Sequence, residues 1–284
     1  LPIRICLNCS LKFISPRPSN LYYKKFFNLD YGKTYYGSKY KPNKEYIKFQ
    51  KIRGNLVYKY FSKIFTKEIK ILDHGCGVGT TMLPWKKNNY KIQGFDPHLP
   101  SINYGIQRFK LDIELSFGEK LKYQKESFDL IISLGSLEHC FDINKCLKEI
   151  WRVLKKKGKL IIRWRSDKLI GSPLEYFGHA TLKYLNITCW QYLLKSHGFK
   201  VIKKINKKIE GYDSFEYLIV EKSNPKKKKS VKIKNLNSQY KKFKNHFYWY
   251  KNICSIINDK KNSFYIKKFK DKKNFIKKNK IGLM

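Results

Sequence analysis

The segment Ile69-Lys-Ile-Leu-Asp-His-Gly-Cys-Gly-Val-Gly-Thr80 carries the strongest structural signal in this chain of 284 residues. A short apolar run ends in an acid, Asp73, and three glycines follow it at alternate positions. The apolar run predicts a buried strand of a parallel sheet, and the glycines predict a turn in which the backbone approaches another group closely. Residues Thr80 to Asn88 then predict a helix. A strand, a turn and a helix N-terminus in this order indicate a site for a nucleotide-type cofactor.

The spacing of the glycines does not fit two common phosphate-binding loops. A dinucleotide-binding loop has the pattern G-x-G-x-x-G, whereas this segment has G-x-G-x-G, with Thr80 at the place of the third glycine. A P-loop requires Gly-Lys followed by Ser or Thr, which is missing here. An acid just before the glycines repels a phosphate but suits a cationic amino-acid group. The sequence therefore favours a cofactor that has such a group.

The segments downstream continue an alternation of strands and helices. Lys91 to Asp96 predicts a second strand that also ends in an acid, roughly twenty residues after the glycines, where an acidic residue binds ribose hydroxyls in related folds. Glu114 to Glu119 predicts a third strand and its exit, and Ser127 to Leu134 a buried fourth. The remaining predictions are a helix over 142–154, a strand over 157–163, a helix from Thr188 opened by a capping box with Gln191, and two strands over 199–205 and 215–221.

Asp73-His-Gly-Cys-Gly-Val-Gly79 resembles motif I of class I S-adenosylmethionine (SAM) methyltransferases, and residues 65–221 follow the order of elements in that family. The resemblance implies an α/β fold, with a Rossmann-like seven-stranded sheet that is mostly parallel, has an antiparallel last strand and carries helices on both faces. It also implies SAM as the cofactor. Phe117 departs from the family, because relatives often place Asp there to bind the adenine amino group.

The resemblance assigns residues to each part of SAM. The methionine end is held by Asp73 and the loop of His74, Gly75, Cys76, Gly77 and Gly79. The ribose is held by Asp96, next to Pro97, and the adenine by Phe117, Gly118 and Glu119, with Leu134 at the end of the fourth strand. His98, two residues after Asp96, is expected to be a surface residue rather than a ligand.

Candidate acceptor-site residues follow the fourth strand. The Asp/Asn-Pro-Pro-Tyr/Phe tetrapeptide of enzymes that methylate nucleic-acid amino groups is replaced by Ser133-Leu-Gly-Ser136, and Glu138-His139 resembles the Leu-Glu-His of small-molecule methyltransferases. His139 is a candidate general base for an acceptor hydroxyl, and the alternative is that it only caps or orients the next helix. His179 is a second candidate base, in an insertion over 166–187 that lines the acceptor pocket in relatives.

The N-terminal residues 1–43 are expected to form the remnant of a zinc module and a Tyr-rich cover over the cofactor site. Cys6 and Cys9 have the spacing of half a zinc site, which needs four ligands. Some members of the family carry such a module, ending in a C-x-x-C and a Pro-Arg-Pro turn. We expect its first cysteine pair to lie upstream of Leu1, so that Cys6 and Cys9 hold no metal in this chain; the alternative is two incidental thiols.

Residues 44–222 are predicted to form the methyltransferase domain. It begins with an amphipathic helix over 44–65, whose core-facing residues are expected to be Ile52, Leu56, Tyr60 and Ile64. Residues 223–284 form a Lys-rich extension with an aromatic stripe at helical spacing. This extension either docks on its own domain, lies on an anionic membrane surface or grips RNA.

The net charge of +41 invites a nucleic-acid interpretation, but nearly all of the positive charge is lysine. Arginine is the residue favoured for base and phosphate recognition, so the charge reflects either an AT-rich genome or an anionic partner. Seven cysteines without regular spacing suggest a reducing, cytoplasmic setting, with peripheral contact at the inner membrane surface as a further option. No apolar run approaches the roughly 20 residues that span a membrane.

The sequence thus predicts a SAM-dependent methyltransferase that moves a methyl group by in-line displacement to a small-molecule, sugar or surface-glycan-precursor acceptor. An RNA methyltransferase that uses the basic surface is the first alternative, and nucleic acid is the less favoured partner. The second is a SAM-binding scaffold without catalytic activity.

Overall fold

The computed structural model of the protein describes residues 3–6, 9, 11–36, 41–164, 181–209 and 212–225. Among these residues, none of the helices is long and apolar enough to cross a membrane. His179, most of the insertion after the fifth strand of the large sheet, and the Lys-rich extension beyond residue 225 lie outside the described residues.

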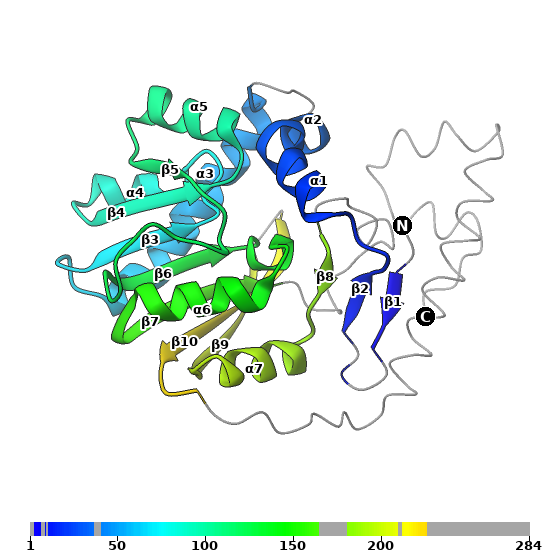
Figure 1. The fold of residues 1–284 in the computed structure, drawn as a ribbon. Coiled ribbons are helices and arrows are strands. Elements are labelled where there is room, and N and C mark those ends of the chain that lie inside the picture. The colour runs from blue at the N-terminus through cyan, green and yellow to red at the C-terminus, as the bar shows by residue number, and fades with distance from the viewer. Residues whose placement is uncertain are drawn as a thin grey trace, which may run out of the picture.

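A seven-stranded sheet forms the centre of the fold, in the order β5-β4-β3-β6-β7-β10-β9 (Figure 1). The first five strands of this order are parallel to one another, and β10 is antiparallel to both of its neighbours, β7 and β9. This confirms the predicted mostly parallel sheet with antiparallel final strands. The strands are β3 (Lys70–His74), β4 (Lys91–Asp96), β5 (Ile113–Leu115), β6 (Phe128–Leu134), β7 (Leu154–Trp164), β9 (Phe199–Ile209) and β10 (Tyr212–Lys222).

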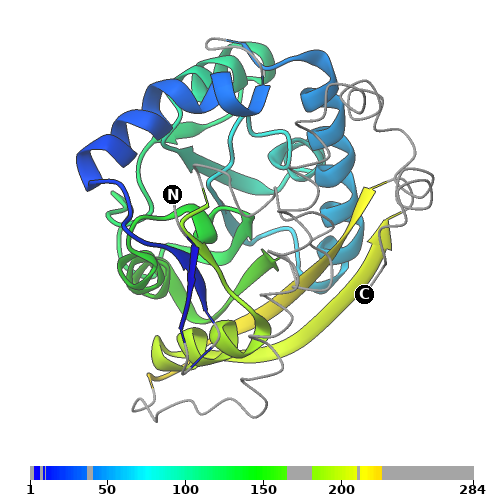
Figure 2. The same ribbon diagram turned by 90° about the vertical axis from the view of Figure 1, so that its right-hand side faces the viewer.

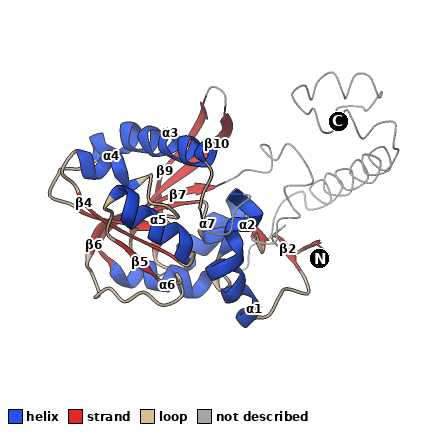
Figure 3. Ribbon diagram, turned by 90° about the horizontal axis from the view of Figure 1, so that it is seen from above, coloured by secondary structure: helices blue, strands red, loops and turns tan. Residues whose placement is uncertain are grey.

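Helices cover both faces of this sheet, as predicted (Figures 1 and 3). Successive side chains of a strand point to opposite faces, so β6 supplies two cores. Leu130 and Ile132 pack with Val57 on one face, while Ile131 packs with Leu147 on the other. The first face carries α3 (Lys44–Phe61), α4 (Met82–Lys87) and α5 (Leu99–Phe109), and the second carries α6 (Ile143–Val153) and α7 (Ile187–Ser196).

The N-terminal residues form a small sheet and a helical cover. Strands β1 (Ile3–Ile5) and β2 (Lys12–Ile14) make an antiparallel pair, which β8 (Lys183–Tyr184) extends. The cover follows as α1 (Asn20–Lys25), η1 (Phe26–Asp30) and α2 (Tyr31–Tyr36), and Figure 2 shows it at one end of the large sheet. Two short 3-10 helices, η2 (Ser62–Ile64) and η3 (Leu137–His139), complete the described elements.

The predicted core-facing stripe of α3 is wrong. Tyr60 and Ile64 are 41% and 48% exposed, and the buried positions of the helix are Ile47, Gln50, Gly54, Val57 and Phe61. The reason lies at Gly54, where a Cβ atom would be 2.7 Å from the carbonyl oxygen of Thr80. The helix therefore turns its glycine side, rather than its most regular aliphatic stripe, toward the residues that follow the glycine loop.

The predicted start of α7 is also displaced. Its N-cap is Asn186, whose Oδ1 accepts a hydrogen bond from the backbone N–H of Cys189 at 2.9 Å, so the helix begins before the predicted capping box at Thr188. The helix stops before Gly198, which has a φ of 80°.

Replacing Gly54 with alanine should lower the free energy of unfolding, measured by urea denaturation, by about 1–3 kcal/mol, because overpacking forces backbone shifts. At an unconstrained helical site the same change raises helix stability by about 1 kcal/mol. Asn55→Ala, at the exposed neighbouring position, is the matched control and should change stability little. A Gly54→Ala protein as stable as wild type would contradict the close approach of α3 to Thr80.

Candidate active site

The glycine loop between β3 and α4 has the backbone conformation that its sequence predicts. Gly75, Gly77 and Gly79 have φ angles of 71°, 58° and 73°, in the left-handed region that side chains disfavour. The backbone N–H groups of Gly75 and Cys76 both donate to the carbonyl oxygen of Phe95, each at 3.0 Å. The loop is thereby anchored to β4, the strand that carries the second acid.

Asp96 joins this loop to the start of α5. Its Oδ2 accepts a hydrogen bond from the N–H of Gly77 at 2.7 Å, and its Oδ1 accepts one from the N–H of His98 at 2.8 Å. Burial raises the pKa of Asp96 to about 6, while the two backbone hydrogen bonds act in the opposite direction. An ionised carboxylate offers about four lone-pair sites, so each oxygen retains acceptor capacity toward a ligand.

His98 is buried, contrary to the surface position expected from the sequence. Only 1% of it is exposed, its Nδ1 lies 2.7 Å from Ser101 Oγ, and it is the N-cap residue of α5. Burial lowers the pKa of His98 to about 4, which keeps the ring neutral. Since its backbone N–H holds Asp96, this residue has a positioning role that side-chain polarity alone does not reveal.

Asp73 is a buried acid with an unused oxygen. It is 2% exposed, and its Oδ2 has no hydrogen-bond partner within the part of the chain that the structure describes. Burial raises the pKa of Asp73 to about 7, the nearby guanidinium of Arg53 lowers it, and the carboxylate of Asp96 raises it further. Such a carboxylate is suited to a cationic partner.

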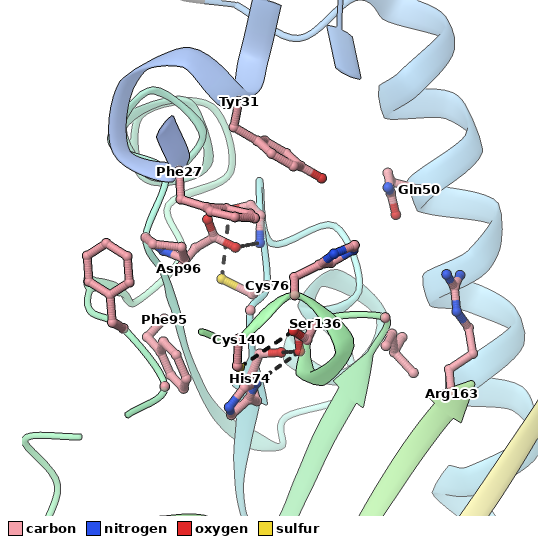
Figure 4. Close-up of a pocket in the computed structure, with 18 of the residues that line it drawn as sticks. Phe27, Tyr31, Gln50, His74, Cys76, Phe95, Asp96, Ser136, Cys140 and Arg163 are labelled. Carbon is pink, nitrogen blue, oxygen red and sulfur yellow. Dashed lines mark hydrogen bonds between the residues drawn. The ribbon is translucent and has the colours of Figure 1, made fainter. Parts of the chain in front are cut away.

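A cavity of about 400 Å³ lies at the carboxyl ends of the parallel strands (Figure 4). This is where open α/β sheets bind ligands, and the volume is within the usual range for small-molecule sites. Most of the predicted cofactor residues and one candidate base form its wall: His74, Gly75, Cys76, Gly77, Asp96, Pro97, Phe117, Gly118, Glu119, Leu134 and His139.

Some predicted residues lie elsewhere. Asp73, Gly79 and Glu138 are not part of the cavity wall. A Cβ at Gly79 would be 2.5 Å from Leu111 Cδ1 and 2.8 Å from Ile113 Cδ1, so this glycine permits packing against Leu111 and β5. Glu138 has a buried Oε2 without a hydrogen-bond partner among the described residues. The roles of these three residues stay predictions.

The candidate base His139 sits in η3 at the edge of the cavity. Its Nδ1 lies 3.3 Å from Oγ1 of Thr181, just before β8, and the ring of Phe27 from the cover is 6.2 Å away between centroids. Glu119 has one oxygen already engaged, since its Oε1 accepts from the N–H of Asp142 at 3.1 Å. The structure thus brings His139 into the cavity and leaves Glu119 one oxygen for a ligand.

The cover forms the opposite wall. Tyr23, Phe27 and Tyr31 line the cavity, and Phe27 and Tyr31 are stacked with ring centroids 5.4 Å apart. These aromatic residues recur every fourth position of one helical segment, so they share a face. This supports the cover that the Tyr-rich N-terminal sequence predicts, with Phe117 packed against the same aromatic cluster.

Sequence reasoning missed the contribution of α3 and of β7. Tyr46, Phe49, Gln50 and Arg53 line the cavity from α3, and Arg163 lines it from the end of β7 (Figure 4). The polar residues Tyr46, Gln50 and Arg53 are four and three positions apart on α3, which marks one helical face. That spacing was the available signal, whereas nothing in the sequence around Arg163 distinguishes it.

Comparison with known proteins agrees with this geometry. Residues 72–162 match the family model of a methyltransferase domain. The chain is 28% identical to the ubiquinone biosynthesis O-methyltransferase of Pelagibacter ubique over 199 residues, 65% of this chain and 82% of that protein. It is also 28% identical to the demethylmenaquinone methyltransferase of Lactobacillus johnsonii over 186 residues, 51% of this chain and 76% of that protein.

Two solved structures show the same fold at low sequence identity. A SAM-dependent methyltransferase from Methanosarcina mazei superposes with a TM-score of 0.50 at 16% identity, covering 60% of this chain and 99% of that one. The cyclase SpnF superposes with a TM-score of 0.50 at 15% identity, covering 61% of this chain and 80% of that one. The second similarity shows that the fold by itself does not decide the reaction.

The domain match, the methyltransferase relatives and the order of the sheet together identify the chain as a SAM-dependent methyltransferase of the class I fold. They give no support to a zinc-binding module at Cys6 and Cys9. Within the described residues these two cysteines are not part of any group of three metal-ligating side chains.

The residues present fit SAM. Gln50 lines the cavity, and its buried Oε1 has no hydrogen-bond partner in the described structure. Within the same described residues, the buried Oδ2 of Asp73, just before the glycine loop, also has no partner. Two acceptors of this kind suit the cationic amino group of the methionine end. The Nε of Arg53, also buried and without a hydrogen-bond partner among the described residues, suits its carboxylate. The role of Asp96 as a ribose ligand stays a prediction.

Replacing Asp96 with alanine should weaken SAM binding at least tenfold, about 1.4 kcal/mol, the scale of a hydrogen bond to a charged group. Isothermal titration calorimetry measures this. Asp112→Ala removes an exposed acid at the entry to β5 and should leave the affinity near that of wild type. Unchanged affinity in the Asp96 variant would remove this carboxylate from the site.

Asp73→Asn should raise the stability of the ligand-free protein at pH 8 while weakening SAM binding. Because burial raises the pKa of Asp73 from 3.8 to about 7, the folded state binds the proton more tightly. The free energy of unfolding therefore falls as the pH rises from about 4 to about 7. The variant should be more stable at pH 8 by about 1.4 kcal/mol or more, the equivalent of one pKa unit.

Urea denaturation at pH 4 and pH 8 checks this prediction, and the advantage of the variant should vanish at the lower pH. Asp112→Asn, at an exposed acid, is the control and should show no such pH dependence. A variant that is destabilised equally at both pH values would mean that the buried carboxylate is already compensated in the folded protein.

Proposed function

We propose that this SAM-dependent methyltransferase transfers the methyl group to a hydroxyl of a small-molecule acceptor, with His139 as the general base. The observation that supports this most is the place of His139, on the wall of the same cavity that Asp96 enters and beside the ring of Phe27. Two relatives that this chain matches over most of their own length are named as a ubiquinone biosynthesis O-methyltransferase and a demethylmenaquinone methyltransferase. These names favour a planar ring acceptor. A sugar or surface-glycan precursor remains the second acceptor class of the proposal.

Bound SAM supplies a methyl group activated by a sulfonium. Asp73 and Gln50 would hold the cationic amino group, Asp96 the ribose hydroxyls, and the loop of Phe117, Gly118 and Glu119 the adenine. Holding cofactor and acceptor in a fixed orientation is worth about 7–11 kcal/mol in favourable systems. The aromatic side chains of the cover exclude water from this end of the cavity.

His139 takes the proton of the acceptor hydroxyl. The proposed base is ring nitrogen Nε2, and the contact of Nδ1 with Thr181 Oγ1 orients the ring. An imidazole has a pKa suited to proton removal near neutral pH. General base catalysis contributes a factor of about 10²–10⁴ to the rate.

The further assignments of the chain are part of this proposal. Residues 1–43 serve as the cover segment, residues 44–222 as the catalytic domain, and residues 223–284 as a basic extension that contacts its own domain, an anionic surface or RNA. His179 is kept as an alternative base.

The acceptor class is tested with SAM carrying a tritiated methyl group. The full chain is incubated in parallel with catechols and demethylated quinones, with a protein-free metabolite extract, and with total RNA. Label in a small product supports the proposal, and its chemistry separates quinone-type from saccharide acceptors. Label in RNA alone would overturn it, and bound SAM with no transfer to any pool would favour the non-catalytic scaffold.

His139→Gln should lower kcat by about 10²-fold to 10⁴-fold, because the acceptor proton then lacks its base. Its SAM affinity should remain near that of wild type. Thr181→Val should cause a smaller loss of kcat, and Thr181→Ser, which keeps the hydroxyl, should restore most of it. Full activity of His139→Gln on the identified acceptor would place the base elsewhere, and His179→Gln is then the next variant to measure.

A further inference from the structure

We propose that His74, Cys140 and Cys146 form a binding site for a zinc ion beneath the cofactor cavity. His74 is the last residue of β3, Cys140 follows η3, and Cys146 lies in α6. All three side chains are buried, and their ligand atoms lie within 4.8 Å of one another. Figure 4 shows His74, Ser136 and Cys140 grouped at the end of β3. Nothing in the methyl-transfer mechanism uses the two thiols.

The hydrogen bonds around His74 leave a nitrogen lone pair directed at this cluster. Ser136 Oγ donates to the carbonyl oxygen of His74 at 2.6 Å, so its hydroxyl hydrogen is committed. The same oxygen lies 2.9 Å from Nδ1 of His74 and therefore accepts the Nδ1 hydrogen. Nε2 is then unprotonated, and it is buried without a hydrogen-bond partner in the described structure.

This arrangement is the usual one for a metal-ligating histidine, which donates its second ring nitrogen to a fixed acceptor. Ser133 Oγ, 2.8 Å from Ser136 Oγ, holds that acceptor from the other side.

Gly118 shows how closely the histidine and one of the thiols approach each other. A Cβ atom at this glycine would lie 2.7 Å from His74 Nε2 and 3.1 Å from Cys146 Sγ. The two ligand atoms therefore sit side by side under the loop that is proposed to contact adenine. Any larger residue at this position would displace one of them.

Lys183 lies beside the proposed metal–thiolate centre. Its ammonium group donates to the carbonyl oxygen of Cys140 and lies close enough to both thiols to interact with their charge. One divalent zinc with two thiolates and a neutral imidazole carries no net charge, which leaves Lys183 opposite Glu119.

The donor set selects the metal. Two thiolates and one imidazole are ligands of zinc, and three protein ligands with an open fourth position are typical of accessible zinc sites. His74 and Cys140 line the cavity, so the fourth position opens toward it. Binding exchanges the two thiol protons for the ion: Zn²⁺ and two S–H groups give two Zn–S bonds and two released protons.

The first test is the zinc content of the full chain, measured by competition with a chromophoric chelator and by elemental analysis. Wild type should bind one zinc ion, and Cys146→Ala should lower the zinc affinity at least tenfold. Even the loss of a residue that only hydrogen-bonds to a metal ligand lowers affinity by about 10-fold to 100-fold. Cys189→Ala removes an equally buried helical thiol of α7 and should retain the metal. Circular dichroism of the metal-free proteins establishes that each variant is folded.

The second test locates the metal. Cobalt in place of zinc should give a thiolate-to-cobalt charge-transfer absorption that Cys146→Ala weakens, and a pH-stat titration of wild type should record two protons released per ion. The double change of Cys6→Ser and Cys9→Ser should leave both signals unchanged. Absence of zinc binding by wild type, or its loss in this double variant instead of in Cys146→Ala, would overturn the proposal.

Discussion

The carboxylate of Asp96 is the constraint on which the rest of the site depends. Its two oxygens hold the N–H groups of Gly77 and His98, which belong to the two loops that follow β3 and β4. The glycine loop is held a second time by the carbonyl oxygen of Phe95, the residue before Asp96. One strand end thus fixes both loops, and the cavity has its shape before a ligand arrives. Preorganisation of this kind lowers the entropic cost of binding.

This arrangement is electrostatically unfavourable without a ligand. Asp73 and Asp96 are both buried, and burial raises the pKa of each, to about 7 and about 6. Burial is the largest cause of the raised pKa of Asp73, the guanidinium of Arg53 lowers this pKa, and the carboxylate of Asp96 raises it. A cofactor with a cationic amino group and a sulfonium relieves the unfavourable charge, so the same burial that lowers the stability of the free protein strengthens binding.

The cofactor end could be predicted from the sequence because its residues are local to two strand ends. Motif I and the acid that ends Lys91–Asp96 are contiguous segments, and strand order then places them together. The predicted N-cap of α7 and the predicted buried side of α3 were wrong for a different reason. Asn186 caps through its own side chain, and Gly54 faces the glycine loop through close backbone contact, so neither depends on the hydrophobic period that sequence analysis measures.

The rest of the cavity wall could not be predicted because distant segments assemble it. Thr181, which contacts His139, precedes β8, Arg163 ends β7, and Gln50 and Arg53 come from α3. Lysine dominates the positive charge of this chain, yet among the described residues the Lys and Arg side chains that line the cavity are those of Arg53 and Arg163. Arg152 likewise uses its planar donor set, bonding both oxygens of Glu149 and two backbone carbonyls. These arginines stand where the geometry of a guanidinium is needed.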